Sequence, residues 1–199
     1  MYIPDPDSVA PGDFDSFVGV FLPTANQTTL NTLQTLYPPV PETDKLGNWR
    51  RVTDFISDVL FTCNAQFLAS TTFSPQGPMT YRYVFGVGSA IHGSDVDFTF
   101  YSGNNNSNKT SSLGDNSNST GIISANKAEQ VAFDMQTMIT NFVLYGRPKV
   151  ESFGNMQLPH YEGDDRATFV FNGTRLYTVL SDPWKNACCD WWQLGLFAD

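Results

Sequence analysis

The amino-acid sequence predicts an α/β fold, in which amphipathic helices alternate with a few short strands. Apolar residues recur at helical spacing over residues 48–67 and again over 124–145, and short extended segments lie between Gly and Pro breaks. The chain has 199 residues, 41% of them hydrophobic, which is enough to bury a core in one or two domains.

The first half of the chain predicts two helices. Residues 1–23 are rich in Pro and Asp, and we expect a loop there. Leucines then recur at every third position over 30–36 and stop before Tyr37-Pro38-Pro39, which indicates a short helix ended by proline. From Asn48, the expected N-cap, an apolar stripe predicts a longer amphipathic helix; its members are Val52, Ile56, Val59, Cys63 and Phe67.

Extended segments follow in the middle of the chain. Residues 81–85 come after a Pro/Gly break and predict a strand, and the glycine-rich residues 86–93 predict a loop that carries His92. Residues 95–100 alternate polar and apolar, which predicts a second short extended or turn segment. Residues 102–120 are rich in Asn and Ser, and we expect them to form a solvated surface loop within the domain rather than a linker.

The last third predicts a helix, a hairpin and an aromatic end. An apolar stripe over 128–145 predicts a helix that Gly146 ends. Residues 168–171 and 175–179 flank Asn172-Gly173, a pair typical of β-hairpins. The final aromatic segment, 184–197, carries two adjacent cysteines.

The chain is acidic, with 11 Lys and Arg against 20 Asp and Glu and a net charge of −9. This balance excludes general binding to nucleic acid, which needs a basic surface, and disfavours docking on an anionic membrane. No run approaches the ~18 apolar residues that a membrane span needs, so we expect no transmembrane segment.

Cysteines and glycosylation motifs bear on the compartment. Cys63, Cys188 and Cys189 lack the spacing of a zinc site, so either one disulfide forms beside a spare thiol or all three are buried thiols, and the residues alone leave this open. Asn-x-Ser/Thr motifs outnumber the roughly 2.6 expected by chance, which favours a secreted glycoprotein. They begin at Asn26, Asn105, Asn108, Asn118 and Asn172.

The first residues do not look like a signal peptide. Residues 1–7 have neither a basic region nor an apolar region. We therefore expect the chain to be a piece of a longer secreted protein.

Candidate catalytic residues are few. The chain has two histidines; His92 is the candidate base, and His160 looks like an ordinary loop residue. Asp95 and Asp97 follow His92, but no further His or Cys lies near in sequence, so we expect neither a metal nor another cofactor. The Gly-x-Ser-x-Gly motif that exposes a nucleophilic serine does not occur. The sequence thus offers a base with nothing to activate.

The residues around His92 resemble a known family. The runs Tyr81-Arg82-Tyr83-Val84-Phe85 and Ile91-His92-Gly93-Ser94-Asp95-Val96-Asp97-Phe98-Thr99-Phe100 are similar to the catalytic-histidine segment of type-B carboxylesterases, a family that includes cholinesterases and lipases of the Candida rugosa type. Further segments resemble family motifs in the same order, at 58–63, 135–148, 158–161 and 189–192. Thr140-Asn141 and Leu158 stand where the family usually has tryptophan.

The resemblance implies an α/β-hydrolase whose triad runs Ser, then Glu or Asp, then His along the chain, with His92 as the base. It covers only the last part of the family, so we expect residues 1–199 to be the C-terminal part of a type-B carboxylesterase domain, with an incomplete sheet and without the serine and the acid. The complete protein would act on a small-molecule or lipid ester. The resemblance also implies a disulfide between Cys63 and Cys189, because Cys189 occupies the family's terminal cysteine position; Cys188 would stay free.

Two other hypotheses belong to different classes. A non-catalytic cholinesterase-like module, used for binding or adhesion, would account for the two missing tryptophans, whereas the presence of His92 favours the enzyme. An acidic binding domain unrelated to hydrolases would require the ordered motif matches to be coincidental.

Overall fold

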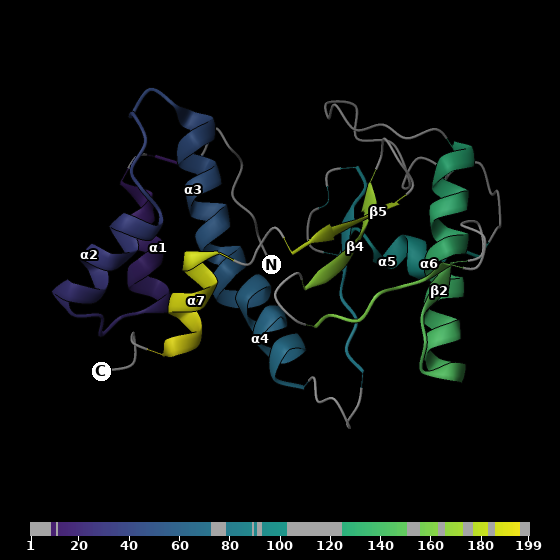
Figure 1. Ribbon diagram of the computed structural model, residues 1–199. Coiled ribbons are helices and arrows are strands. Elements are labelled where there is room, and N and C mark those ends of the chain that lie inside the picture. Colours follow the sequence, from purple (N-terminus) through teal and green to yellow (C-terminus); the bar gives the residue numbers. More distant parts are fainter. Residues whose placement is uncertain are drawn as a thin grey trace. The chain divides into compact units, whose positions relative to one another are not determined.

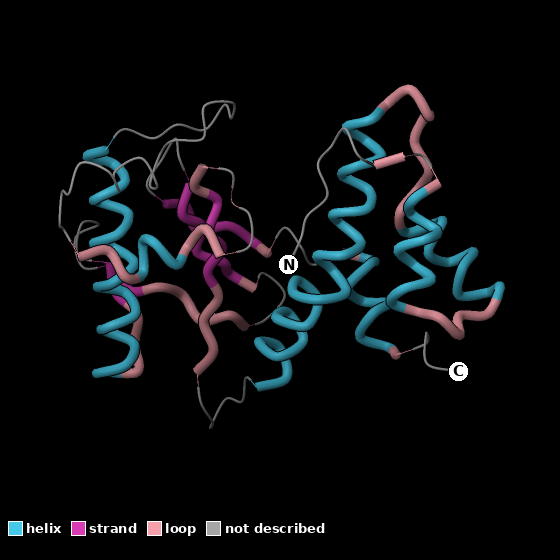
Figure 2. The backbone as a smooth tube through the Cα atoms, turned by 180° about the vertical axis from the view of Figure 1, so that it is seen from behind, coloured by secondary structure: helices cyan, strands magenta, loops and turns pink. Residues whose placement is uncertain are grey.

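The computed structural model describes residues 9–10, 12–72, 79–88, 90, 93–102, 125–150, 156–162, 166–172, 177–182 and 186–195, and the chain forms two compact units (Figure 1). Unit 1 comprises Met1–Leu68 and Pro183–Asp199, and unit 2 comprises Ala69–Asp182. Figure 2 shows that the strands belong to unit 2, whereas the described part of unit 1 consists of helices and loops.

Unit 1 is helical. Its elements are α1 (Asp13–Phe21), α2 (Gln27–Leu36), α3 (Lys45–Ser57), the π-helical turn η2 (Asp58–Thr62), the first part of α4 (Cys63–Thr72), and α7 (Ala187–Leu194). Its buried core is mainly aromatic and aliphatic, and consists of Val9, Phe14, Val18, Leu33, Tyr37, Val52, Phe55 and Ile56. Helix α2 confirms the predicted leucine helix, because it ends where Tyr37 precedes the two prolines.

Helix α1 corrects the loop expected over residues 1–23. Phe14 and Val18, four residues apart, are both buried in the unit 1 core, and Phe17 and Phe21 pack against it. This spacing places the four apolar side chains on one face of a helix. The tertiary contacts of that face outweigh the loop-like Pro and Asp composition.

Helix α3 begins earlier than the sequence predicted. Its N-cap is Asp44, whose carboxylate accepts a hydrogen bond from the Gly47 amide at 2.8 Å. Asn48 is not a cap, since it lies buried in the first turn and donates to the Asp44 carbonyl at 3.1 Å.

The turn η2 changes which residues are buried after it. Val52, Ile56 and Cys63 lie on the buried face as predicted, but Phe67 is 45% exposed and Gln66 is fully buried instead. A π-helical turn inserts a residue relative to an α-helix, which rotates every following side chain around the axis. An apolar stripe predicted at α-helical spacing therefore gives the wrong buried residues beyond residue 63.

Unit 2 contains a three-stranded sheet in the order β1-β4-β5. Its elements are β1 (Tyr83–Gly86), α5 (Val96–Thr99), α6 (Ala125–Tyr145), β2 (Lys149–Val150), β3 (Met156–Gln157), β4 (Ala167–Asn172) and β5 (Tyr177–Ser181). Strand β1 runs parallel to β4, with Tyr83 opposite Phe169, and β4 pairs antiparallel with β5. The predicted hairpin is confirmed, although its connection, residues 173–176, lies outside the described residues.

Helix α6 packs one apolar face on this sheet. Its buried side chains are those of Ala128, Val131, Ala132, Met135 and Met138, and they form a core with Phe169 and Phe171 of β4. The predicted helix is confirmed, and Gly146 ends it with a positive φ of 68°. The predicted stripe is buried only as far as Met138, because Phe142 is 47% exposed and Tyr145 is 71% exposed.

Residues 96–99 form the one-turn helix α5 rather than an extended segment. Phe98 is buried in the unit 2 core, whereas Val96 and Phe100 are exposed. The alternation over residues 95–100, which predicted a short extended or turn segment, therefore does not correspond to two faces of a sheet.

Two further predictions, the solvated loop over residues 102–120 and the absence of a transmembrane segment, can be compared with the structure only in part. Residues 102–120 are predicted to form a polar loop, and of these only residue 102 is described. Within the part of the chain that the structure describes, no helix is both long and apolar enough to cross a membrane.

Candidate functional site

The candidate site lies at the carboxyl end of β1, which ends at Gly86, and His92 follows soon after it in the sequence. Strand β1 is parallel to β4, and in parallel sheets ligand-binding residues gather at the carboxyl ends of the strands. His92, like Ser89 and Ile91, lies outside the described residues. The neighbouring residues on both sides therefore define its place in the chain.

The described residues on either side of 91–92 have a left-handed backbone. Ala90 and Gly93 have positive φ values of 48° and 85°. The Ala90 amide donates to the Val87 carbonyl at 3.3 Å, and the Val96 amide donates to the Gly93 carbonyl at 3.1 Å. A left-handed alanine is strained, and such strain is concentrated at functional sites.

The start of the loop is fixed by a close approach between strands. A Cβ added to Gly86 would lie 3.0 Å from the Phe171 carbonyl oxygen of β4. A side chain at this position would require the β4 backbone to shift by a few tenths of an ångström. Gly86 therefore allows the end of β1 to lie close to β4.

A strand side chain anchors the end of the loop. The Tyr83 hydroxyl donates to Asp95 Oδ2 at 3.3 Å, and the Thr99 hydroxyl donates to the Asp95 carbonyl at 2.9 Å. Burial raises the pKa of Tyr83, and the neighbouring Asp95 carboxylate raises it further. Asp95 thus joins β1 to α5, whereas Asp97 lies exposed on α5.

A buried ion pair at the other end of β1 was not predicted from the sequence. Arg82 pairs with Asp182, which follows β5, and the Tyr161 hydroxyl donates to the same carboxylate oxygen at 2.5 Å. The Asp182 side chain is fully buried. Burial and the Asp182 contact raise the pKa of Tyr161. The three side chains link the start of β1 to the chain beyond β5, and we assign them a structural role.

Signals for this network in the sequence are weak. A charged residue between two tyrosines in a predicted strand suggests that Arg82 has a buried partner. Nothing local identifies that partner, because Asp182 lies 100 residues further along the chain.

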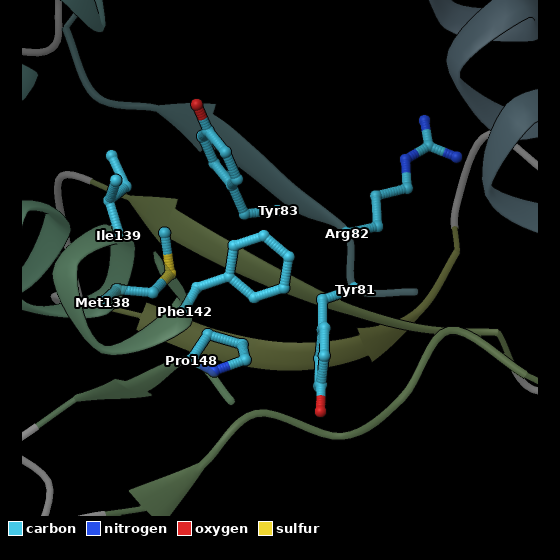
Figure 3. A pocket seen from close by; sticks show the side chains of 7 residues that line it. All are labelled: Tyr81, Arg82, Tyr83, Met138, Ile139, Phe142 and Pro148. Atoms are coloured by element: carbon cyan, nitrogen blue, oxygen red, sulfur yellow. The ribbon is translucent and has the colours of Figure 1, made fainter. Parts of the chain in front are cut away.

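An apolar pocket adjoins β1 on the side of α6 (Figure 3). It has a volume of about 160 Å³. Residues 81–83, in and just before β1, line one side of it. The other lining residues come from α6 and from the turn after it, and are Met138, Ile139, Phe142 and Pro148. Tyr83 belongs to both the pocket and the Asp95 contact, so the pocket lies next to the segment that contains Asp95.

Unit 1 contains the disulfide that the resemblance implies. Cys63 and Cys189 are joined, and Cys188 is a free, partly buried thiol. Among the described residues, the Asp58 carboxylate lies close enough to both sulfurs to share a metal ion with them. Because both sulfurs are in the disulfide, no pair of thiolates is available there, and we assign no metal.

The predicted glycosylation sites fall into two groups. Asn26 is an exposed N-cap of α2, and its side-chain oxygen accepts from the Thr29 amide at 2.9 Å. Asn172 is the partly buried last residue of β4. The three other acceptors lie outside the described residues; they are Asn105, Asn108 and Asn118.

No protein-family model and no curated protein matches the chain. Among solved structures, it is similar to a carboxylesterase of Geobacillus stearothermophilus, with 20% sequence identity and a TM-score of 0.44. The likeness covers 87% of this chain and 36% of the other. The chain thus spans about a third of the length of that enzyme.

Proposed function

We propose that the chain is the C-terminal part of a secreted carboxylic ester hydrolase of the type-B carboxylesterase family, and that it supplies the histidine of the catalytic triad. The main support is the order of its motifs, which follow one another as they do in that family. A second support is that His92 follows a parallel strand in the sequence and that Ala90, which lies between them, has the strained backbone often found at functional sites.

In this function the imidazole of His92 moves a proton. It would take the proton of a serine hydroxyl as the serine oxygen attacks the ester carbonyl, and would then give that proton to the leaving alcohol. Residues outside 1–199 would supply the serine, the oxyanion donors and the acid. Asp95 is not assigned as the acid, because its carboxylate already accepts from Tyr83.

We expect the chain by itself to hydrolyse esters no faster than the buffer does. A base accelerates the reaction only for a nucleophile within hydrogen-bond reach, and the members of a triad act as a unit. Release of p-nitrophenol from p-nitrophenyl acetate measures this directly. An enzymatic rate that disappears in His92→Ala would mean that a local hydroxyl, such as Ser94, serves as the nucleophile.

The decisive experiment extends the chain. The genomic sequence upstream of residue 1 should contain, in frame, a Gly-x-Ser-x-Gly motif and an acidic triad segment. In the extended protein, His92→Ala should lower kcat by about 10⁴-fold or more with little change in KM. His160→Ala is the matched control, because it removes the chain's other histidine, and it should leave kcat unchanged.

Two results would overturn the proposal. One is an upstream sequence without a serine motif, which would favour the non-catalytic binding module. The other is an active extended enzyme whose kcat is the same with and without His92.

A further inference from the structure

The apolar pocket of Figure 3 has no part in the proton transfer proposed for His92. It lies within unit 2, between one face of the β1 segment and the second half of α6. Tyr83 is the first residue of β1 and Tyr81 lies just before it; both side chains line the pocket, and Figure 3 shows their rings pointing in opposite directions. Met138, Ile139 and Phe142 share a helix face because they are one to four residues apart on α6.

Aromatic rings make up much of the wall. The Tyr81 and Phe142 rings meet edge to face, with centroids 5.9 Å apart. Phe142 is 47% exposed and Tyr83 is 38% exposed, whereas Met138 is buried. The pocket is therefore open at a rim of rings and closed at a floor of core side chains, so a bound apolar molecule would remove ring surface from water.

The polar groups of the lining are turned out of the pocket. The Arg82 guanidinium points away from the other side chains in Figure 3 and pairs with Asp182. The Tyr83 hydroxyl is directed to Asp95, and the Tyr81 hydroxyl contacts Met79 Sδ at 3.7 Å. A ligand would thus meet carbon and sulfur and no cation, which favours an uncharged molecule.

The pocket has the size of a single ring. Its volume is about 160 Å³, and cavities of about 150 Å³ lined by aliphatic and aromatic side chains bind benzene. We propose that this pocket is a binding site for a small, uncharged aromatic molecule of one ring. This inference does not rest on the proposed ester hydrolysis, since none of the residues that line the pocket takes part in the proton transfer.

Methyl NMR tests the proposal without any activity. The chain is labelled with ¹³C at its methionine methyl groups and titrated with toluene. The Met138 methyl, which lines the pocket, should shift saturably with a dissociation constant on the order of 1 mM, as suits a ligand of so few atoms. The methyl of Met135, buried one turn earlier on α6 and outside the lining, should move much less.

Matched variants test the location. Ile139→Phe puts a ring into the pocket and should weaken toluene binding at least tenfold. Val143→Phe adds the same ring at a nearby position of α6 that is 74% exposed and outside the lining, so binding should be unchanged. Phe142→Ala removes a half-exposed rim ring with little effect on the core and should weaken binding several-fold, as measured on protein whose circular dichroism is unaltered.

A negatively charged ligand provides the last test of the proposal. Benzoate has the same ring and an added carboxylate, and it should bind at least tenfold more weakly than toluene, because the pocket offers no free cation. No saturable shift at Met138, equal shifts at Met135, or equal binding of benzoate and toluene would each overturn the proposal.

Discussion

Replacing Asp58 by asparagine tests whether one buried carboxylate sets the pH dependence of unit 1. Asp58 opens the turn η2, and its side chain accepts a hydrogen bond from the Tyr37 hydroxyl at 2.8 Å. The Trp192 indole donates to the same hydroxyl at 2.9 Å. Burial raises the pKa of Asp58 from 3.8 to about 6, and this exceeds the lowering that the Tyr37 hydrogen bond causes.

The direction in which pH changes the free energy of unfolding follows from how many protons the folded and unfolded states bind. Because the pKa of Asp58 is about 6 in the folded state and 3.8 is its ordinary value, the folded state binds more protons between these pH values. The contribution of Asp58 to the free energy of unfolding is therefore most favourable below pH 3.8, falls as the pH rises to 6, and stays low above that. The difference, 6 − 3.8, corresponds to about 3 kcal/mol.

The asparagine variant should remove this dependence. Its amide has nearly the same shape, and its oxygen can still accept from Tyr37, but it does not ionise. We expect Asp58→Asn to be more stable than the parent by about 2–3 kcal/mol near pH 8 and no more stable near pH 4.

Urea denaturation followed by tryptophan fluorescence is the suitable assay. All four tryptophans of the chain belong to unit 1, so the signal reports the unfolding of that unit. Asp190→Asn is the control, since Asp190 is exposed on α7 of the same unit. The reasoning is refuted if Asp58→Asn follows the parent at every pH or is the less stable protein near pH 8.

Other perturbations have equally direct outcomes. Cys63→Ala should lower the free energy of unfolding of unit 1 by about 4–5 kcal/mol, because the disulfide closes a long loop, and an unchanged urea midpoint would contradict this. Asp182→Asn should cost unit 2 about 3–5 kcal/mol, because it leaves the charge of Arg82 buried without its partner, and melting followed by circular dichroism should show the loss. On expression in a secretory host, at least one sequon of the 102–120 loop should carry a glycan, and unmodified mass at every sequon would remove the support for secretion.

Local patterns predicted the elements whose packing is local. Helix α6 and the β4–β5 hairpin follow from side-chain spacing and turn residues within one stretch of sequence. Helix α1 was missed because its Phe14 and Val18 are stabilised by distant helices of the unit 1 core, while its composition is that of a loop. The π-helical turn η2 could not be predicted by counting apolar residues at a fixed α-helical spacing.

The sequence predicted the strand that precedes the candidate site, but not the contacts around it. The sequence predicts a strand before His92, and the structure describes that strand as parallel to β4, whereas His92 itself lies outside the described residues. The Tyr83–Asp95 contact and the Arg82–Asp182 pair could not be inferred, because each depends on how separate segments fold together. The pocket beside α6 could not be inferred either, because residues of separate strand and helix segments line it.

The order of the segments along the chain has a consequence for biosynthesis. Unit 1 uses both ends of the sequence, and the whole of unit 2 lies between them. On the ribosome, all of Ala69–Asp182 is made before α7, so unit 2 can fold while unit 1 still lacks its last helix and the cysteine that pairs with Cys63. A stop codon just before Asn186 would spare every residue of unit 2 and remove α7, the disulfide and the indole that donates to Tyr37.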